Sequence, residues 1–530
     1  MAYKEMKQQN DLLLINPGIY SSTRSYGQML HEPTMGLYVL RDYLTNRGFK
    51  IEILDGAYKK LDKAEILKRI QVSAVVGFYA VYTNMKTIFE LSSLIKDKNP
   101  NSIILIGGPN WPAGREILLA ESNIDIVIKG EGESSLEKIL LRLKDGGGVT
   151  PEITNGTFLR FSGQIINAGK DSSLQVSSKN SKPISIQFNV PNMKKSILKL
   201  ITAKGCPNRC HFCPSPKWQE LASIEKLVQV MEAAWHKGID TFYIADENFC
   251  PPKLSHRTIL FCNLVKNCDL KKARLYLKLF LEPHMPLDAL NQLSQIAHIT
   301  AFVGFESFSD NTLKFLGKNT TRQNNLLFWN TARKFGINIL PGIITLHPFL
   351  SPEELLDLIN VLSMHNALSW RLLLKKLDLY PGTHLLTKMK SKFPDLIKNE
   401  FSSFIHPSYW SYAYDKNLGR PIMANIEKAF MFIAEQNEVK ELYSLMFDLS
   451  FVVEKKEGKI VDRYYSIRSD FVRYTRKLAL KIVKIITQNP DVNFKKQLDP
   501  SISQYLNVID IILKNCRKLF WSYDSKRDQV

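Results

Sequence analysis

Short apolar segments alternate with amphipathic segments over the first 144 residues. The apolar segments are rich in Ile, Leu and Val, which is typical of buried parallel strands; they lie at 11–16, 50–54, 74–79, 102–108 and 125–130. Between the third and the fourth of them, Met85, Ile88 and Ile95 recur at the spacing of one helix face. This alternation predicts a parallel sheet with helices on both faces.

Loops rich in glycine follow these predicted strands. Ligands of such sheets bind beyond the carboxyl ends of the strands, and glycine lets the backbone approach a large ligand closely. The candidate ligand-binding positions are therefore Pro17, Tyr79, Thr83, Gly107, Gly108, Pro109, Gly130, Glu131 and Gly132. The same glycines could equally serve only to make tight turns between strand and helix.

A polar stretch at residues 146–195 separates this part from the rest of the chain. It opens with Gly146, Gly147 and Gly148, and residues 155–166, NGTFLRFSGQII, predict a hairpin. We expect a linker with a small β element here, and a domain boundary near residue 145.

A second series of apolar segments begins near residue 196. Six of them predict strands separated by helices, at 198–203, 241–245, 273–281, 299–305, 337–346 and 371–380. Six strand–helix units make most of a TIM-type β/α barrel, which we expect over residues 196–385.

Polar residues follow the predicted barrel strands at the end where such barrels carry their chemistry. Three cysteines follow the first strand, acidic residues follow the next three, and a histidine follows the fifth: Cys206, Cys210, Cys213, Asp246, Glu247, Glu282, Glu306 and His347. If the strands are correct, these side chains converge on one mouth.

The pattern becomes mainly helical beyond the barrel, and we expect a helical domain at residues 386–530. Its segment 468–486 is basic and amphipathic. Such a helix can lie on a membrane or bind nucleic acid, but it more commonly packs its apolar face on a neighbouring domain, which is our prediction.

Composition narrows the classes of protein. The formal net charge of +20 could indicate nucleic acid, anionic lipid or an acidic substrate, but lysines are spread through every segment, so we expect a basic surface and no nucleic-acid partner. The seven cysteines are an odd number, the amino terminus has no apolar signal core, and no apolar run is long enough to span a bilayer. We therefore expect a cytoplasmic protein that does not bind a membrane.

The three clustered cysteines lie in residues 205–216, GCPNRCHFCPSP. Structural zinc takes four protein ligands, and an electron-carrying cluster takes four cysteines. A cubane of four irons held by three thiolates leaves one iron open to a ligand, while a catalytic zinc with three thiolates stays an alternative. The other cysteines, Cys250, Cys262, Cys268 and Cys516, are expected to be small packed hydrophobes.

The segment CPNRCHFC matches CxxxCxΦC, with Phe212 at the aromatic position, and resembles the signature of the radical S-adenosylmethionine (SAM) superfamily. The stretches NPG, EPTMGLYVLRDYL, IGGPNW and KGEGE resemble the cobalamin-binding domain that precedes the barrel in one subgroup. ADENF, GFESFSDNTLKFLGKNTT and LYPGTHL resemble that subgroup's DDxF, GxES and PGT motifs. The resemblance covers roughly residues 11–385 and implies a Rossmann-like, flavodoxin-type domain at 1–145.

The resemblance implies a 4Fe-4S cluster on Cys206, Cys210 and Cys213, whose open iron chelates SAM. It implies further cofactor contacts from the barrel mouth, at Phe212, Asp246, Glu247, Glu282, Glu306 and Ser307. One electron, from a donor such as flavodoxin or ferredoxin, would cleave SAM and give a radical that removes a hydrogen atom from the substrate. In this subgroup cobalamin then supplies a methyl group, which implies a methyltransferase acting on an unactivated carbon of a peptide or natural-product precursor.

Two alternatives stay open at this point. The chain lacks the D-x-H-x-x-G motif that gives cobalamin a histidine ligand, so cobalamin is expected to bind without a protein imidazole. A radical enzyme of the same fold that cyclises, rearranges or oxidises its substrate without cobalamin is the first alternative. The second is an RNA-modifying radical enzyme, although sulfur-inserting relatives carry amino-terminal cysteines and none precedes Cys206 here.

Overall fold

Five parallel strands form the centre of the amino-terminal sheet, whose order is β2-β1-β3-β4-β5-β6-β7. The computed structural model describes residues 10–18, 33–56, 61–70, 73, 75–81, 84–108, 114–154, 156–169, 184–190, 195–215, 217, 220–272, 275–380, 382–399, 410–412, 420–453 and 459–524. The parallel strands are β1 (Leu12–Asn16), β2 (Ile51–Asp55), β3 (Val75–Tyr79), β4 (Ile103–Gly107) and β5 (Ile126–Ile128). The order 2-1-3-4-5 is that of flavodoxin, as the sequence predicted.

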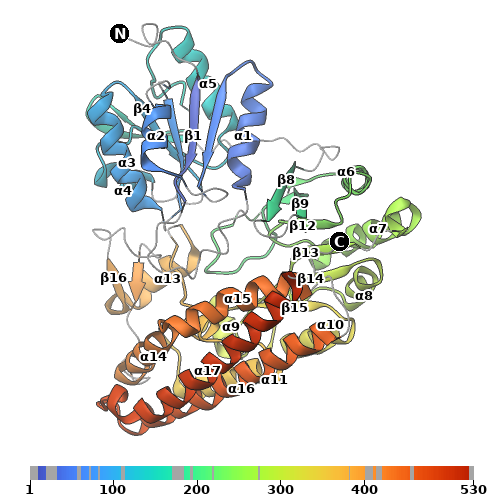
Figure 1. Cartoon of the computed structure of the whole chain (residues 1–530). Coiled ribbons are helices and arrows are strands. Elements are labelled where there is room, and N and C mark those ends of the chain that lie inside the picture. The colour runs from blue at the N-terminus through green and yellow to red at the C-terminus, as the bar shows by residue number, and fades with distance from the viewer. Residues whose placement is uncertain are drawn as a thin grey trace.

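Helices cover both faces of this sheet (Figure 1). They are α1 (Met35–Thr45), α2 (Lys63–Ile70), α3 (Met85–Lys98), α4 (Gly114–Ala120) and α5 (Glu133–Lys144). Alternate strand residues point to opposite faces, so Leu13 and Ile15 pack with α2, α3 and α4, whereas Leu12 and Leu14 pack with α1 and α5. The doubly wound architecture therefore follows from strands that are apolar on both sides.

The predicted hairpin forms, but it does not stand apart as a linker element. β6 (Thr157–Phe161) pairs antiparallel with β5, and β7 (Gln164–Ala168) pairs with β6, so both strands extend the amino-terminal sheet. Leu159 and Ala168 are buried in the same core as α1 and α5. That apolar contact, which local sequence does not encode, attaches the hairpin to the first domain.

The second sheet is the partial β/α barrel, in the order β15-β14-β13-β12-β9-β8. Neighbouring strands are parallel except at one edge, where β8 runs antiparallel to β9. The strands are β8 (Ile184–Val190), β9 (Lys195–Ile201), β12 (Thr241–Ile244), β13 (Tyr276–Leu281), β14 (His298–Glu306) and β15 (Asn338–Ile343). The edge strand β8 lies in the stretch that the sequence assigned to the linker.

The predicted sixth strand at residues 371–380 is wrong for most of its length. Its start belongs to the short helix α12 (Trp370–Leu373), and only one parallel bridge, from Leu346 to Lys376, remains at the sixth barrel position. The backbone N–H of Trp370 donates to the hydroxyl of Tyr443 (2.7 Å), and its indole Nε1 donates to the hydroxyl of Tyr505 (2.8 Å). These contacts with distant helices fix the segment as a helical turn.

The remaining elements surround the barrel strands. The helices are α6 (Ile224–Trp235), α7 (Ser255–Asn267), α8 (Leu287–Ile296), α9 (Asp310–Leu316), α10 (Arg322–Lys334), α11 (Pro352–Met364) and α13 (His384–Lys392), with short 3-10 turns η3 (Pro252–Leu254), η4 (Asp269–Lys272) and η5 (Pro394–Leu396). Two small antiparallel pairs join β10 (Ala203–Lys204) to β11 (Glu220–Leu221) and β16 (Ile397–Asn399) to β17 (Trp410–Tyr412).

Four long helices form the carboxyl-terminal layer: α14 (Arg420–Ala434), α15 (Asn437–Val453), α16 (Lys459–Gln488) and α17 (Phe494–Asp524). Phe471, Leu478 and Ile482 of α16 are buried in one continuous core with the barrel helices, and α16 packs on α11. The prediction that the basic amphipathic segment packs on a neighbouring domain is therefore confirmed. Within the described ranges, no helix is long and apolar enough to cross a membrane.

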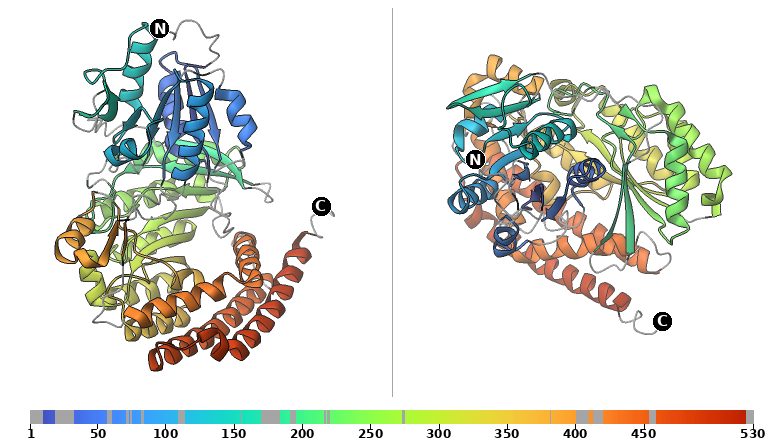
Figure 2. Two further views of the ribbon diagram at one scale, coloured as in Figure 1. Left: turned by 90° about the vertical axis from the view of Figure 1, so that its left-hand side faces the viewer. Right: turned by 90° about the horizontal axis from the view of Figure 1, so that it is seen from above.

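The three parts are stacked in space. Figure 2 shows the amino-terminal unit on one side of the barrel and the long red helices on the other. Residues at the carboxyl ends of β3, β4 and β5 line one cavity together with residues that follow β9 and β12, so these ends of the first sheet face the mouth of the barrel.

Candidate active site

The cysteine loop lies between β10 and β11 at the mouth of the barrel. Cys206 is buried, and Cys210 and Cys213 are half-buried. The loop is fixed at its centre by His211, whose backbone N–H donates to the carbonyl of Leu316 (2.8 Å) and whose carbonyl accepts from the N–H of Leu385 (2.8 Å). The end of α9 and the start of α13 therefore hold the cysteine loop from two sides.

Gly317 is required where α9 meets this loop. Its φ of +67° is in the left-handed region, and a Cβ there would lie 2.5 Å from the ring of His211. Phe212, the aromatic residue of the motif, packs against the apolar cluster that contains Leu316 and Leu385. We therefore propose that Phe212 anchors the loop through this cluster.

The thiols lie where their charged forms are costly. Burial raises the pKa of Cys206 to about 11 and that of Cys210 to about 12, although the positive charge of Lys318 opposes the second shift. Buried thiols with such pKa values stay protonated at neutral pH, and a bound metal is what favours their thiolate forms. The loop thus suits a metal centre better than a free reactive thiol.

Both carboxylate oxygens of Asp246 already have protein partners. Its Oδ1 accepts from the backbone N–H groups of Thr202 (2.6 Å) and Ala203 (3.0 Å), and its Oδ2 accepts from the hydroxyl of Thr202. Burial raises its pKa to about 6, although these hydrogen bonds oppose the shift. These contacts favour a positioning role for Asp246, which fixes the end of β9 just before the cysteine loop, over the direct cofactor contact that the resemblance implied.

Three other acidic residues surround the mouth. Glu247 lines the cavity described below, and burial raises its pKa. Glu306 has a φ of +62° beside a β-bulge in β14, and burial raises its pKa to about 7. Glu282 accepts a hydrogen bond of 2.5 Å from the ammonium group of Lys318. Ser307 is buried, and its hydroxyl accepts from the N–H of Ser309 (3.1 Å), so its contacts are with the backbone.

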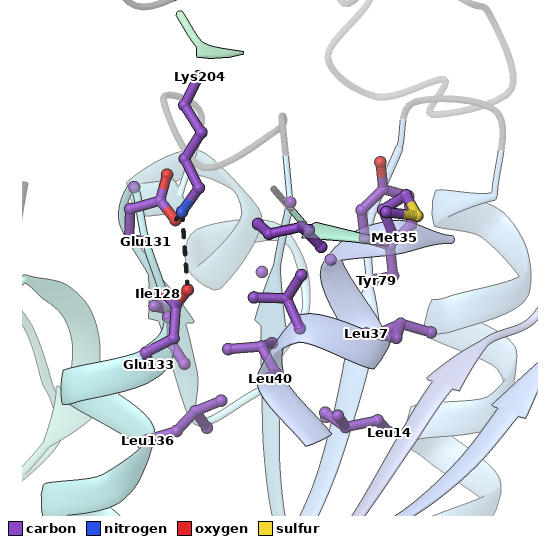
Figure 3. Close-up of a pocket in the computed structure, with 18 of the residues that line it drawn as sticks. Leu14, Met35, Leu37, Leu40, Tyr79, Ile128, Glu131, Glu133, Leu136 and Lys204 are labelled. Carbon is purple, nitrogen blue, oxygen red and sulfur yellow. Dashed lines mark hydrogen bonds and ion pairs between the residues drawn. The ribbon is translucent and has the colours of Figure 1, made fainter. Parts of the chain in front are cut away.

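A cavity of about 360 Å3 lies between the amino-terminal sheet and the barrel. Six of the predicted ligand positions line it: Tyr79, Gly107, Gly108, Gly130, Glu131 and Gly132. Ile201, Gly205 and Glu247 line it from the barrel side. Pro17 is not part of this lining, and its backbone lies against Gly56; Thr83 and Pro109 lie outside the described residues. Figure 3 shows apolar side chains such as Leu40, Leu37 and Ile128 around this space.

An ion pair joins the two domains at the edge of the cavity. The Nζ of Lys204 lies 2.9 Å from Oε2 of Glu131 and 3.9 Å from Oε1 of Glu133 (Figure 3). Because Lys204 directly precedes Gly205 and Cys206, this contact couples the loop before α5 to the cysteine loop. Sequence reasoning missed Lys204, since nothing in its neighbourhood indicates a distant acidic partner.

A buried polar network shapes the loops at the end of the first sheet. Asn16 donates to the hydroxyl of Thr34 (2.8 Å), and the N–H of Thr34 donates to Asp55 (2.7 Å). Asn84 donates to the carbonyl of Tyr79 (2.9 Å) and to Oδ1 of Asn16 (3.3 Å). The network joins the ends of β1, β2 and β3 to the residues that precede α1 and α3.

Comparisons with known proteins agree with this architecture. Residues 30–140 match the family model of the B12 binding domain, and residues 200–362 match that of the radical SAM superfamily. An uncharacterized methyltransferase of Pyrococcus horikoshii is 24% identical over 407 residues, which cover 72% of this chain and 83% of that protein. The chain therefore contains a radical SAM domain preceded by a B12-binding domain.

Two solved structures have a similar fold. The cobalamin-dependent SAM radical enzyme OxsB, with aqua-cobalamin bound, gives a TM-score of 0.68 at 16% identity and covers 98% of this chain and 81% of its own. The radical SAM methyltransferase TsrM from Kitasatospora setae, with tryptophan and a SAM analogue bound, gives a TM-score of 0.58 at 16% identity, covering 72% and 76%. The two matched family models, not these structures, assign the cofactors: cobalamin to the B12-binding domain, and SAM with the 4Fe-4S cluster to the radical SAM domain.

The residues present suit these three groups. Cobalamin needs open space beside backbone, and a Cβ added at Gly36 or Gly107 of the cavity wall meets no atom within 4 Å. SAM needs polar partners. Among the described residues, Nδ2 of Asn208, the amide of Asn248 and Nδ1 of His284 are buried without a hydrogen-bond partner, in the loops after β10, β12 and β13. Unsatisfied buried polar atoms are costly, and a polar ligand relieves that cost.

Proposed function

We propose that the enzyme transfers a methyl group to an unactivated carbon of a small-molecule or peptide precursor. The observation that supports this function is one cavity with walls from both domains: Gly107 lines it from the B12-binding domain, and Gly205 and Glu247 line it from the barrel. When bound, the cluster and SAM supply a radical that removes a hydrogen atom, and cobalamin supplies the methyl group. A shared enclosure brings the two reactions within reach of one substrate carbon.

The chain's own residues would divide the work as follows. Cys206, Cys210 and Cys213 would hold the cluster. Glu247 and Glu306 would face the positively charged ammonium and sulfonium groups of SAM, because carboxylates at a partly desolvated mouth attract cations strongly. The Lys204 ion pair would keep the B12-binding domain over the mouth and limit the entry of water.

The inner face of the barrel sheet favours a substrate with an apolar, planar part. Alternation along the strands places Tyr243, Phe280 and Phe302 on the same face as the acidic residues that follow their strands. The rings of Tyr243 and Phe280 lie 6.2 Å apart, and those of Phe280 and Phe302 lie 5.2 Å apart. Phe302 is 42% exposed although it lies in the middle of a sheet. The Nζ of Lys199 lies 5.1 Å from the ring centre of Tyr243, which adds a positive charge. The row suits a planar compound with an acidic group.

The test uses reconstituted enzyme with cobalamin, a one-electron reductant and SAM labelled with deuterium in its methyl group. The candidate substrates to screen are aromatic and heteroaromatic acids. With the correct substrate, we expect a product that contains the intact labelled methyl group, together with 5′-deoxyadenosine. The matched control is Cys210→Ala, which should form neither compound. Deoxyadenosine formed with a product that lacks the label would contradict methylation and favour cyclisation, rearrangement or oxidation.

A further inference from the structure

Lys318 is a buried cation beside the barrel mouth that the sequence analysis did not identify. Its side chain is 1% exposed, and its Nζ lies 2.5 Å from Oε2 of Glu282 and 3.8 Å from Oε1 of Glu306. Burying an ammonium group is expensive unless opposite charges compensate it. The two carboxylates supply that compensation: burial alone would lower the pKa of Lys318, but their charges raise it above its ordinary value.

The backbone holds these three side chains together. Lys318 follows Gly317, the left-handed cap of α9, and its own N–H donates to the carbonyl of Leu313 (2.9 Å). At the centre of the group, a Cβ on Gly304 would lie 2.8 Å from Oε1 of Glu306 and 3.5 Å from Nζ of Lys318. A glycine at position 304 therefore leaves the space in which the ammonium meets its partners.

The positive charge also lies close to the cysteine loop, because Gly317, the residue before Lys318, lies against the ring of His211, which follows Cys210 in the chain. Lys318 lowers the cost of a thiolate at Cys210, whereas Glu282 and Glu306 raise it. With both carboxylates ionised, which for Glu306 requires a pH above its pKa of about 7, the two glutamates and the ammonium carry a net charge of −1. Without the lysine, the two ionised carboxylates would carry −2 beside the thiolate of Cys210.

We propose that Lys318 is a positioning residue that makes the cluster easier to reduce and that holds Glu282 and Glu306 toward SAM. Reduction adds one electron from an external one-electron donor to the cluster and breaks no bond, so it makes the centre one charge more negative. A fixed cation beside Cys210 favours that change. The inference rests on the cluster site proposed for the three cysteines.

The test measures the cluster's midpoint potential in reconstituted protein without SAM, by redox titration followed by electron paramagnetic resonance. Lys318→Met keeps the length of the side chain and removes its charge. We expect the ratio of reduced to oxidised cluster at a fixed potential to fall about tenfold, which equals about 59 mV for a one-electron couple. Lys318→Arg should keep the wild-type potential. Lys314→Met, an exposed change on α9, is the matched control.

A double variant separates charge from packing. Lys318→Met with Glu282→Gln has the wild-type net charge of −1 in this group, so its potential should return toward that of the wild type. A loaded Lys318→Met variant with an unchanged potential would overturn the role of Lys318. If the Lys318→Met protein binds no cluster, the double variant provides the test. We expect it to have a potential near that of the wild type, and a potential about 59 mV lower would overturn the role of Lys318. Wild-type protein that takes up no iron and sulfide would instead refute the cluster site itself.

Discussion

Replacing Gly36 by leucine should weaken cobalamin binding while leaving the fold intact. Gly36 is the second residue of α1 and lines the cavity of about 360 Å3 between the domains. A Cβ built there meets no atom within 4 Å, so a larger side chain enters the cavity without a clash in the protein. The substitution therefore competes with the ligand and not with the core.

The two expected free-energy changes have opposite signs. Glycine within a helix costs roughly 0.5–1 kcal/mol relative to alanine, and leucine is nearly as good a helix former as alanine, so the variant should be at least as stable as the wild type. Overfilling a packed site costs about 1–3 kcal/mol, which corresponds to binding weakened about 5- to 150-fold. Alanine at the same position should give a smaller loss.

Equilibrium dialysis of hydroxocobalamin against cluster-free protein measures the binding, and urea denaturation measures the free energy of unfolding. Gly148→Leu is the matched control, because Gly148 is exposed and a Cβ there also meets no atom within 4 Å. If folded Gly36→Leu protein binds cobalamin with the wild-type Kd, this cavity is not the cobalamin site and the reasoning fails.

Three further predictions concern the barrel. Burial raises the pKa of Asp246 from 3.8 to about 6, so the free energy of unfolding of the wild type falls as pH rises through this range. Asp246→Asn removes this dependence, and the stability difference between variant and wild type should grow by about 3 kcal/mol from pH 4 to pH 7. A difference that is the same at both pH values in urea titrations would refute this. Gly317→Ala should lose about 1–2 kcal/mol from backbone strain alone, and displacement of His211 should lower the iron content measured after reconstitution. Cys210→Ser should lose the cluster absorbance but keep the cobalamin affinity, since Cys210 lies outside the lining of the cavity.

Local chemistry explains what the sequence predicted correctly. The spacing of Cys206, Cys210 and Cys213 places three thiols in one loop whatever surrounds it. The apolar strands of the first sheet are buried on both faces, so their pattern alone indicated parallel strands between helices, and the structure has that order. The predicted packing of the segment 468–486 followed from its apolar face in the same way.

The errors come from contacts between distant parts of the chain. Residues 371–380 have the composition of a strand, but Trp370 bonds to Tyr505 on α17, 135 positions away, and its segment begins as a helical turn. The hairpin after residue 155 formed as predicted, yet its domain was decided by burial of Leu159 against α1 and α5. The apolar pattern of a segment predicts a strand, but it does not specify the sheet in which that strand pairs.

The sequence by itself determined that three thiols share one loop, the class of both domains and the edge of the first sheet that borders the cavity, because each depends on residues within short segments. Only the tertiary structure decided that Asp246 supports β9, that Lys204 joins the domains and that Lys318 compensates Glu282 and Glu306. Charges interact through space, and a buried ion pair stabilises the protein only where the fold brings both partners out of water together.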